Sequence, residues 1–118
     1  MEIRCKVNYD TKSDVLWLYT NPKRTKESVL VSEDVVLDLD MYDQVIGVEL
    51  FWAYELLHTL NPRITEEMLG ALQEAWVEVI PYRQQRIIAL RFVHEGQTIT
   101  ERLPILSNTD GVLPVAVS

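Results

Sequence analysis

Hydrophobic side chains recur at every second position along much of the first half of the chain. Residues 3–9 read I-R-C-K-V-N-Y, in which apolar and polar side chains alternate without a break. Successive side chains of a β-strand point to opposite faces, so this period is typical of a strand with one buried and one wet face. A chain patterned in this way is expected to build a sheet.

Three further segments within the first 52 residues are also extended in pattern. Residues 15–20 are apolar on both faces, which is typical of a central strand that is covered twice. A third segment runs over 27–40 with a bend near Glu33, and a fourth runs over 45–52 with these side chains directed inward: Ile46, Val48, Leu50 and Trp52. Polar turns separate the segments, so the pattern predicts a four-stranded antiparallel meander.

The middle of the chain changes to a helical pattern. A short helix is expected over 54–60, ended by Asn61-Pro62, because the residue before a proline disfavours the helical conformation. A second helix is expected after Thr65, a favourable N-cap residue followed by two glutamates.

The last third returns to strands. Residues 76–80 fit either a continued helix or a strand, and we favour a strand starting near Ala75 because β-branched residues pack well on a pleated surface. A hairpin is expected over 86–94 and 97–103 around Glu95-Gly96. The tail after Leu103 is expected to be extended or partly loose.

Length and composition complete the architecture. A chain of 118 residues with 47% hydrophobic and 25% charged residues is typical of one globular domain. We therefore expect a single domain over 1–118 of the α+β class. A mostly antiparallel sheet would dominate it, with one or two central helices and C-terminal β-strands, so that 61–118 forms a helix plus a β-hairpin extension.

The net charge and the N-terminal sequence limit the expected partners and the expected location of the protein. The net charge of −7 repels phosphate backbones and anionic lipid heads, so we expect neither nucleic acid nor a membrane as partner. The one local basic cluster, Lys23–Lys26, follows Asn21-Pro22, which is typical of a solvated loop tip. No signal core and no run of about 18 apolar residues occurs. We expect a cytoplasmic protein.

Familiar catalytic patterns do not assemble. The single cysteine, Cys5, falls on the apolar face of the first strand, where a small buried hydrophobe is expected. His58 and His94 stand at the ends of elements, as caps or surface residues commonly do. Four glycines form no phosphate-binding loop. We therefore expect no cofactor and no enzymatic activity.

Acidic residues cluster around the turn at 38–49, which reads D-L-D-M-Y-D-Q-V-I-G-V-E. If Asp38, Asp40 and Glu49 share one face of a hairpin, their carboxylates lie within cross-strand reach and could bind a divalent cation such as magnesium or calcium. The alternative is that they are solvent-facing strand and turn residues, which is where acidic side chains ordinarily lie. We favour the alternative.

The same half of the chain carries a resemblance to a known family. Its motifs are Tyr9-Asp10, Asp14–Leu18, Val36–Asp40 and Val45–Leu50. In order and spacing they resemble the small bacterial family called domain of unknown function 2283, over roughly residues 3–57. The sequence departs from the family at Tyr42-Asp43-Gln44, where an Asp-Gly is usual. The resemblance implies a compact β-rich fold, an uncharacterised role and, for some members, an association with small toxin-type proteins.

The aromatic content points to an interaction module. A sheet with apolar residues on both faces must cover the second face with a helix, with the rest of the chain or with a partner. Phe51 and Tyr54 follow the change of face at the end of the fourth strand and are the expected contact residues. We therefore expect a non-enzymatic module that forms a homo-oligomer, such as a dimer, or binds another protein. The alternatives are the cation site at 38–49 and an antitoxin-like partner of a small basic protein.

Overall fold

The computed structural model describes residues 2–83 and 85–105. Its strands are β1 (Glu2–Asp10), β2 (Val15–Tyr19), β3 (Glu27–Ser32), β4 (Val35–Leu39), β5 (Val45–Phe51), β6 (Glu74–Tyr82), β7 (Gln85–His94) and β8 (Gln97–Ile105). Its helices are α1 (Ala53–Leu60), α2 (Glu66–Ala71) and the short 3-10 helix η1 (Pro22–Arg24). Neither α-helix is long and apolar enough to cross a membrane.

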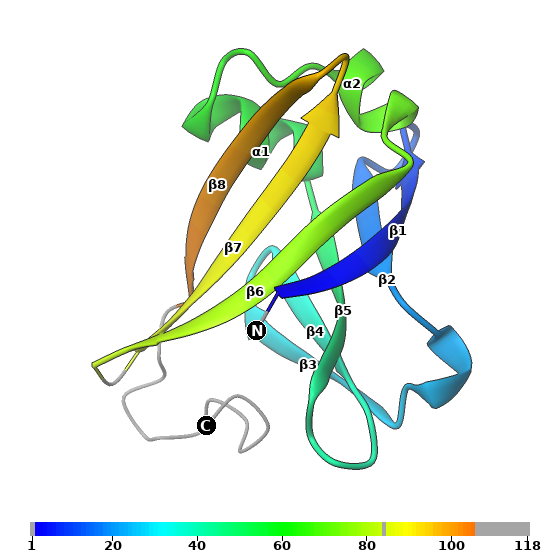
Figure 1. Ribbon diagram of the computed structural model, residues 1–118, viewed down its shortest axis with the longest axis vertical. Coiled ribbons are helices and arrows are strands. Elements are labelled where there is room, and N and C mark those ends of the chain that lie inside the picture. The colour runs from blue at the N-terminus through cyan, green and yellow to red at the C-terminus, as the bar shows by residue number, and fades with distance from the viewer. Residues whose placement is uncertain (1, 84, 106–118) are drawn as a thin grey trace.

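The strands form one antiparallel sheet in the order β3-β4-β5-β2-β1-β6-β7-β8. Figure 1 shows that this sheet curves into a half-barrel, with α1 and α2 together at its upper end. The predominance of the antiparallel sheet is confirmed. The two α-helices are short, with eight and six residues. The molecule is therefore better described as a mainly β half-barrel than as the α+β fold that the sequence predicted.

The hydrophobic core is continuous from one end of the sheet to the other. All eight strands and both α-helices contribute buried side chains to one cluster, among them Leu18 of β2, Leu50 of β5, Leu57 of α1, Leu90 of β7 and Leu103 of β8. The residues that alternate with them along the strands point to the opposite, outer face of the sheet.

The expected four-stranded meander is wrong in two respects. The segment 27–40 is a hairpin of two strands, β3 and β4, in which Ser32 pairs with Val35 around a tight turn at Glu33-Asp34. In addition, β2 pairs with β5 and not with the strand that follows it in sequence. The connection through η1 carries the chain to the far edge of the sheet, and β4 and β5 then return toward β2.

The remaining elements agree with their predictions. α1 ends at Leu60 as expected, and the Thr65 hydroxyl caps α2 by accepting a hydrogen bond from the Met68 N–H at 3.1 Å. The stretch 76–80 lies in strand β6, and β7 and β8 pair around Glu95-Gly96. Residues 106–118, which hold most of the expected tail, lie outside the described part of the chain.

Trp52 does not point inward, as the alternation of the fourth strand predicted. Strand β5 ends at Phe51, and Trp52 adopts the left-handed conformation, with φ 54°, as the residue that precedes α1. This conformation breaks the two-residue period. The side chain is consequently 60% exposed.

Candidate functional site

The structure brings Asp38 and Glu49 together on the outer face of the sheet. Asp38 of β4 lies opposite Gly47 of β5 and opposite Ser28 of β3. Glu49 is two residues further along β5, opposite Trp17 of β2. Residues i and i+2 of a strand share a face, so the two acids are diagonal neighbours across the β4–β5 pair.

Asp38 is buried and fully hydrogen-bonded. The residue is only 3% exposed to solvent. Oδ1 accepts a hydrogen bond from the Ser28 hydroxyl at 2.7 Å, and Oδ2 accepts one from the Trp17 indole N–H at 3.1 Å. These bonds connect side chains from β2, β3 and β4 across the outer face.

The pKa of Glu49 lies well above that of an ordinary glutamate. Burial, the hydrogen bond to Asp38 and the negative charge of Asp38 together raise the pKa of Glu49 to about 7. A negative charge on Asp38 opposes a second charge nearby, so Glu49 titrates in the neutral pH range.

Gly47 provides the space that this pair needs. A Cβ atom at position 47 would lie 3.0 Å from Asp38 Oδ2 and 3.0 Å from the backbone oxygen of Leu18. The carboxylate of Asp38 therefore occupies the volume that a side chain at position 47 would fill.

Asp40, the third expected cation ligand, has a different environment. Its Oδ1 accepts hydrogen bonds from the backbone N–H groups of Tyr42 at 2.8 Å and Gln44 at 3.0 Å. Its Oδ2 accepts one from Arg24 Nη2 at 3.4 Å. Asp40 therefore closes the β4–β5 turn and fixes it to η1.

These environments correct the favoured interpretation of the acidic turn. Asp38 and Asp40 are not solvent-facing, since they are only 3% and 2% exposed. Local donors satisfy their oxygens, and this is what makes their burial tolerable. Among residues 2–83 and 85–105, no three His, Cys, Asp or Glu side chains are grouped so that they could hold a metal ion. Cation binding remains a prediction that melting curves with magnesium or calcium would test.

Asp14, an aspartate of the earlier motif, supports the start of α1. The Tyr9 hydroxyl donates to Asp14 Oδ1 at 2.7 Å, and the same oxygen accepts from the Tyr54 N–H at 2.8 Å. The Ala53 N–H donates to the backbone oxygen of Asp14 at 2.9 Å. Asp14 thus caps α1 from a distant turn, in place of Trp52, which makes no side-chain cap bond.

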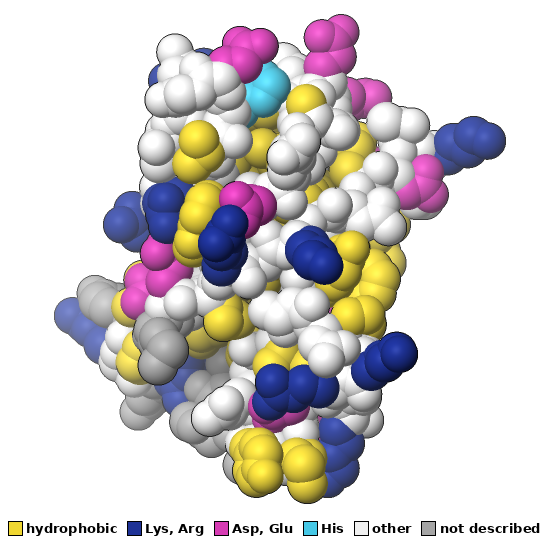
Figure 2. Space-filling view, turned by 45° about the vertical axis from the view of Figure 1, so that its right-hand side comes forward, with side chains coloured by type: hydrophobic (Ala, Val, Ile, Leu, Met, Phe, Trp, Pro, Cys, Tyr) yellow, Lys and Arg dark blue, Asp and Glu magenta, His cyan; other side chains and the backbone are white. Residues whose placement is uncertain are grey.

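A small hollow of about 230 Å³ lies beside Glu49 on the outer face. Its lining consists of Asn8, Asp10, Ser13, Val15, Trp17 and Glu49. Figure 2, in which the β1–β2 side of the molecule comes forward, shows hydrophobic side chains at the surface between Lys and Arg side chains.

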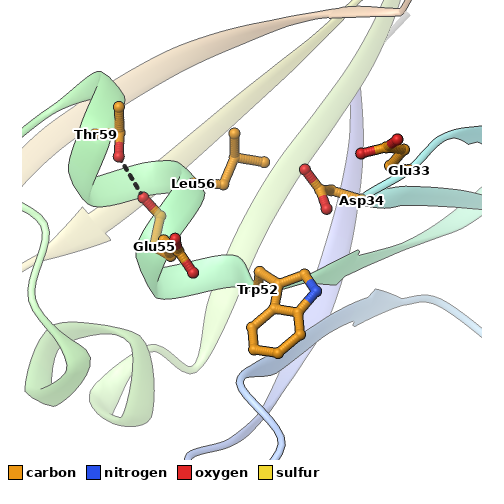
Figure 3. Close-up of a pocket in the computed structure, with 6 residues that line it drawn as sticks. All are labelled: Glu33, Asp34, Trp52, Glu55, Leu56 and Thr59. Atoms are coloured by element: carbon orange, nitrogen blue, oxygen red, sulfur yellow. Dashed lines mark hydrogen bonds between the residues drawn. The ribbon is translucent and has the colours of Figure 1, made fainter.

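A larger hollow of about 410 Å³ lies where β5 leads into α1, and we call it the Trp52 hollow. Its lining consists of Glu33, Asp34, Trp52, Glu55, Leu56 and Thr59. Figure 3 shows the carboxylate of Glu55 on one side, those of Asp34 and Glu33 on the other, and Leu56 between them. The Trp52 ring forms the remaining side of the hollow.

The two expected contact residues stand on either side of Trp52 and are only partly exposed. Phe51 pairs with Val15 inside the sheet, whereas Tyr54 packs against the core and stacks on His58 with ring centroids 4.9 Å apart. Sequence reasoning missed Trp52 because it extended the strand by one residue. A helix begins directly after Trp52, although tryptophan is not a favourable N-cap residue. This mismatch is the feature of the sequence that marks position 52 as unusual.

The described fold is thus that of a mainly β half-barrel with an acidic pair on its outer face. Residues 6–53 match the model of the family described as Protein of unknown function (DUF2283). The resemblance expected from the motifs is thereby confirmed over that segment, which runs from within β1 to the first residue of α1. No curated protein and no solved structure matches the chain.

Proposed function

We propose that this protein is a non-enzymatic module that binds another protein through the surface around Trp52. The observation that carries the proposal is the exposure of this ring, 60% of which faces solvent at the rim of the Trp52 hollow. Tryptophan is among the residues most enriched at the energetic centres of protein interfaces, because a large ring buries much area at a small loss of conformational entropy.

The backbone at Trp52 supports the same proposal. A bulky residue in the left-handed region is uncommon and costs free energy. At position 52 the left-handed conformation directs the tryptophan side chain away from the sheet. A glycine or an asparagine would adopt this backbone conformation more easily than a tryptophan does. A requirement for the ring at the surface accounts for this choice of residue.

The Asp38–Glu49 pair favours a structural role over catalysis. A general base must present an oxygen to its substrate. Both oxygens of Asp38 already accept hydrogen bonds from Ser28 and Trp17, and the Glu49 side chain is hydrogen-bonded to Asp38.

The test is site-specific photo-cross-linking in the native host. Trp52 is replaced by p-benzoyl-phenylalanine, and the same replacement at Glu67, exposed on α2, is the control. We expect position 52, and not position 67, to give an adduct with one other protein or with a second copy of the chain. Mass spectrometry distinguishes the two. The absence of any adduct specific to position 52 would overturn the proposal.

A further inference from the structure

We infer that the Trp52 hollow receives an arginine side chain from a basic segment of another protein. The inference rests on the proposed function and specifies the chemistry of the partner. It follows from the charge of the hollow, from its aromatic wall and from a matching arrangement elsewhere in the chain.

The hollow has three carboxylates and no cation of its own. Among the described residues, no Lys, Arg or His forms an ion pair with Glu33, Asp34 or Glu55. Other acids of the chain do have such partners, since Glu2 pairs with Arg91 and Glu74 pairs with Arg4. Like charges gathered around a concave surface raise the local potential and favour a cation from outside.

The aromatic wall favours a planar cation. A guanidinium group stacks on a tryptophan face and donates to carboxylates at its edge, and both interactions are better than those a lysine ammonium makes. In Figure 3 the carboxylate of Glu55 lies on one side of the hollow and those of Asp34 and Glu33 on the other, with the Trp52 ring below them. The volume of about 410 Å³ lies within the range of pockets that hold small ligands.

The same arrangement already exists within the chain at Trp76. Arg91 Cζ lies 4.1 Å from the centre of the Trp76 ring. The guanidinium also donates to Glu2 from Nε at 3.0 Å and from Nη2 at 2.9 Å. A tryptophan face, a carboxylate and an arginine thus form one unit there, whereas the Trp52 hollow has the first two components.

An anionic occupant is disfavoured, although the hollow adjoins the amino end of α1. The N–H groups of Ala53 and Tyr54 already donate to the backbone and side-chain oxygens of Asp14. The carboxylates of the hollow repel a second anion in addition.

A second copy of the chain is a poorer occupant than a basic protein. Each copy carries a net charge of −7, so two copies repel each other at long range. Three of its arginines, Arg4, Arg24 and Arg91, are already paired with acids of the same chain. A basic partner would instead be attracted to the hollow before contact.

The test is a titration of the full chain with N-acetyl-arginine amide, observed through the indole N–H resonances in proton–nitrogen NMR spectra. The chain has three tryptophans, and Trp52→Asn, which suits the left-handed backbone, assigns the resonance of Trp52. We expect a saturable shift of that resonance and no comparable shift for Trp17 or Trp76. N-acetyl-citrulline amide, which has nearly the same shape without the charge, should bind roughly tenfold more weakly.

Two variants locate the effect in the hollow. Glu55→Gln and Asp34→Asn should each weaken arginine binding several-fold, whereas Glu67→Gln, an exposed change on α2, should not. Equal shifts with citrulline, no shift of the Trp52 resonance, or equal weakening by Glu67→Gln would overturn the inference.

The two proposals fail separately. A cross-linked partner at position 52 without any response to arginine amide would overturn the inference and leave the protein-binding function standing. A specific response to arginine amide without a cross-linked partner would overturn the proposed function, and with it the protein source of the arginine, while the affinity of the hollow for a guanidinium group would stand.

Discussion

The pKa of Glu49 is raised because its side chain is partly buried beside the carboxylate of Asp38. Its pKa rises from 4.5 to about 7 in the folded chain. A group whose pKa is higher in the folded state binds more protons there than in the unfolded chain. Its contribution to stability is therefore complete below pH 4.5 and is lost as the pH rises through about 7.

The first prediction concerns this titration. Between pH 5.5 and 8.5 the melting temperature of the wild-type protein should fall more than that of Glu49→Gln, in which an uncharged amide replaces the titrating group. At pH 8.5 the variant should be the more stable of the two by several degrees, as scanning calorimetry would show. The control Glu67→Gln should keep the wild-type pH dependence, and a Glu49→Gln profile parallel to the wild type would contradict the assignment.

Gly47 gives the second prediction. Gly47→Ala should lower the free energy of unfolding by about 1 to 3 kcal/mol, the usual cost of forcing extra atoms into a packed site. Urea denaturation measures the loss. Gly70→Ala is the matched control, because nothing lies within 4 Å of the added Cβ and alanine is favoured in a helix. Its unfolding free energy should stay level or rise, and similar losses in both variants would contradict a specific clash at position 47.

The roles of single residues were only partly predictable from the sequence. The alternation placed Gly47 and Glu49 together on the face opposite Ile46, Val48 and Leu50, but it could not give the register. The pairing of Asp38 with Gly47 decides which carboxylate enters the space that the glycine leaves. Without that register, burial of the two aspartates was not expected, because isolated charges are normally excluded from such places.

At the scale of elements, a hairpin or a helix could be predicted from the sequence only where its turn or cap contains a residue typical of that structure. The β7–β8 hairpin was predictable because Glu95-Gly96 places a glycine where φ is +77°. The β3–β4 hairpin turns at Glu33-Asp34, which contains no glycine or asparagine, so one long bent strand fitted the sequence equally well. Helix α2 was marked by the Thr65 cap, whereas the cap of α1 comes from Asp14, 39 residues before the helix starts.

This remote cap gives the third prediction. Asp14→Ala should lower the free energy of unfolding by about 2 kcal/mol. The substitution removes the acceptor of the Tyr54 N–H, and it forces an alanine to adopt the left-handed backbone conformation that Asp14 has, with φ 55°. Asp14→Asn should cost less than half as much, since asparagine tolerates that conformation and keeps one acceptor oxygen. Both losses are measurable by urea denaturation. Equal losses in the two variants would indicate that the charge of Asp14, and not its cap, is what matters.

At the scale of the whole molecule, the period of two gave the faces of the strands but not their neighbours. Backbone hydrogen bonds are the same for every residue, so the strand order depends on which apolar faces close together around the core. Here β1 connects the two parts of the sheet, because it pairs with β2 on one side and with β6 on the other. The family match ends at Ala53, so β6, β7 and β8 extend the matched segment across β1.

The last prediction tests whether the matched segment folds without that extension. We expect the fragment 1–60 to be largely unfolded, because core residues such as Leu18 and Leu50 belong to one cluster with Val77, Leu90 and Phe92. Losing these contacts exposes apolar surface at roughly 25 cal/mol per Å², and a small fragment has little stability to lose. Circular dichroism and NMR dispersion measure the loss.

The fragment 61–118 serves as the complement in the same experiment. An equimolar mixture of the two fragments should regain the spectrum of the intact chain, since the loop after α1, in which Pro62 and Arg63 are exposed, joins parts that share one core. Cooperative unfolding of 1–60 alone would instead mean that β1 to β5 with α1 form an independent unit. In that case the chain would contain two domains, and β6 to β8 would be an addition to a complete fold.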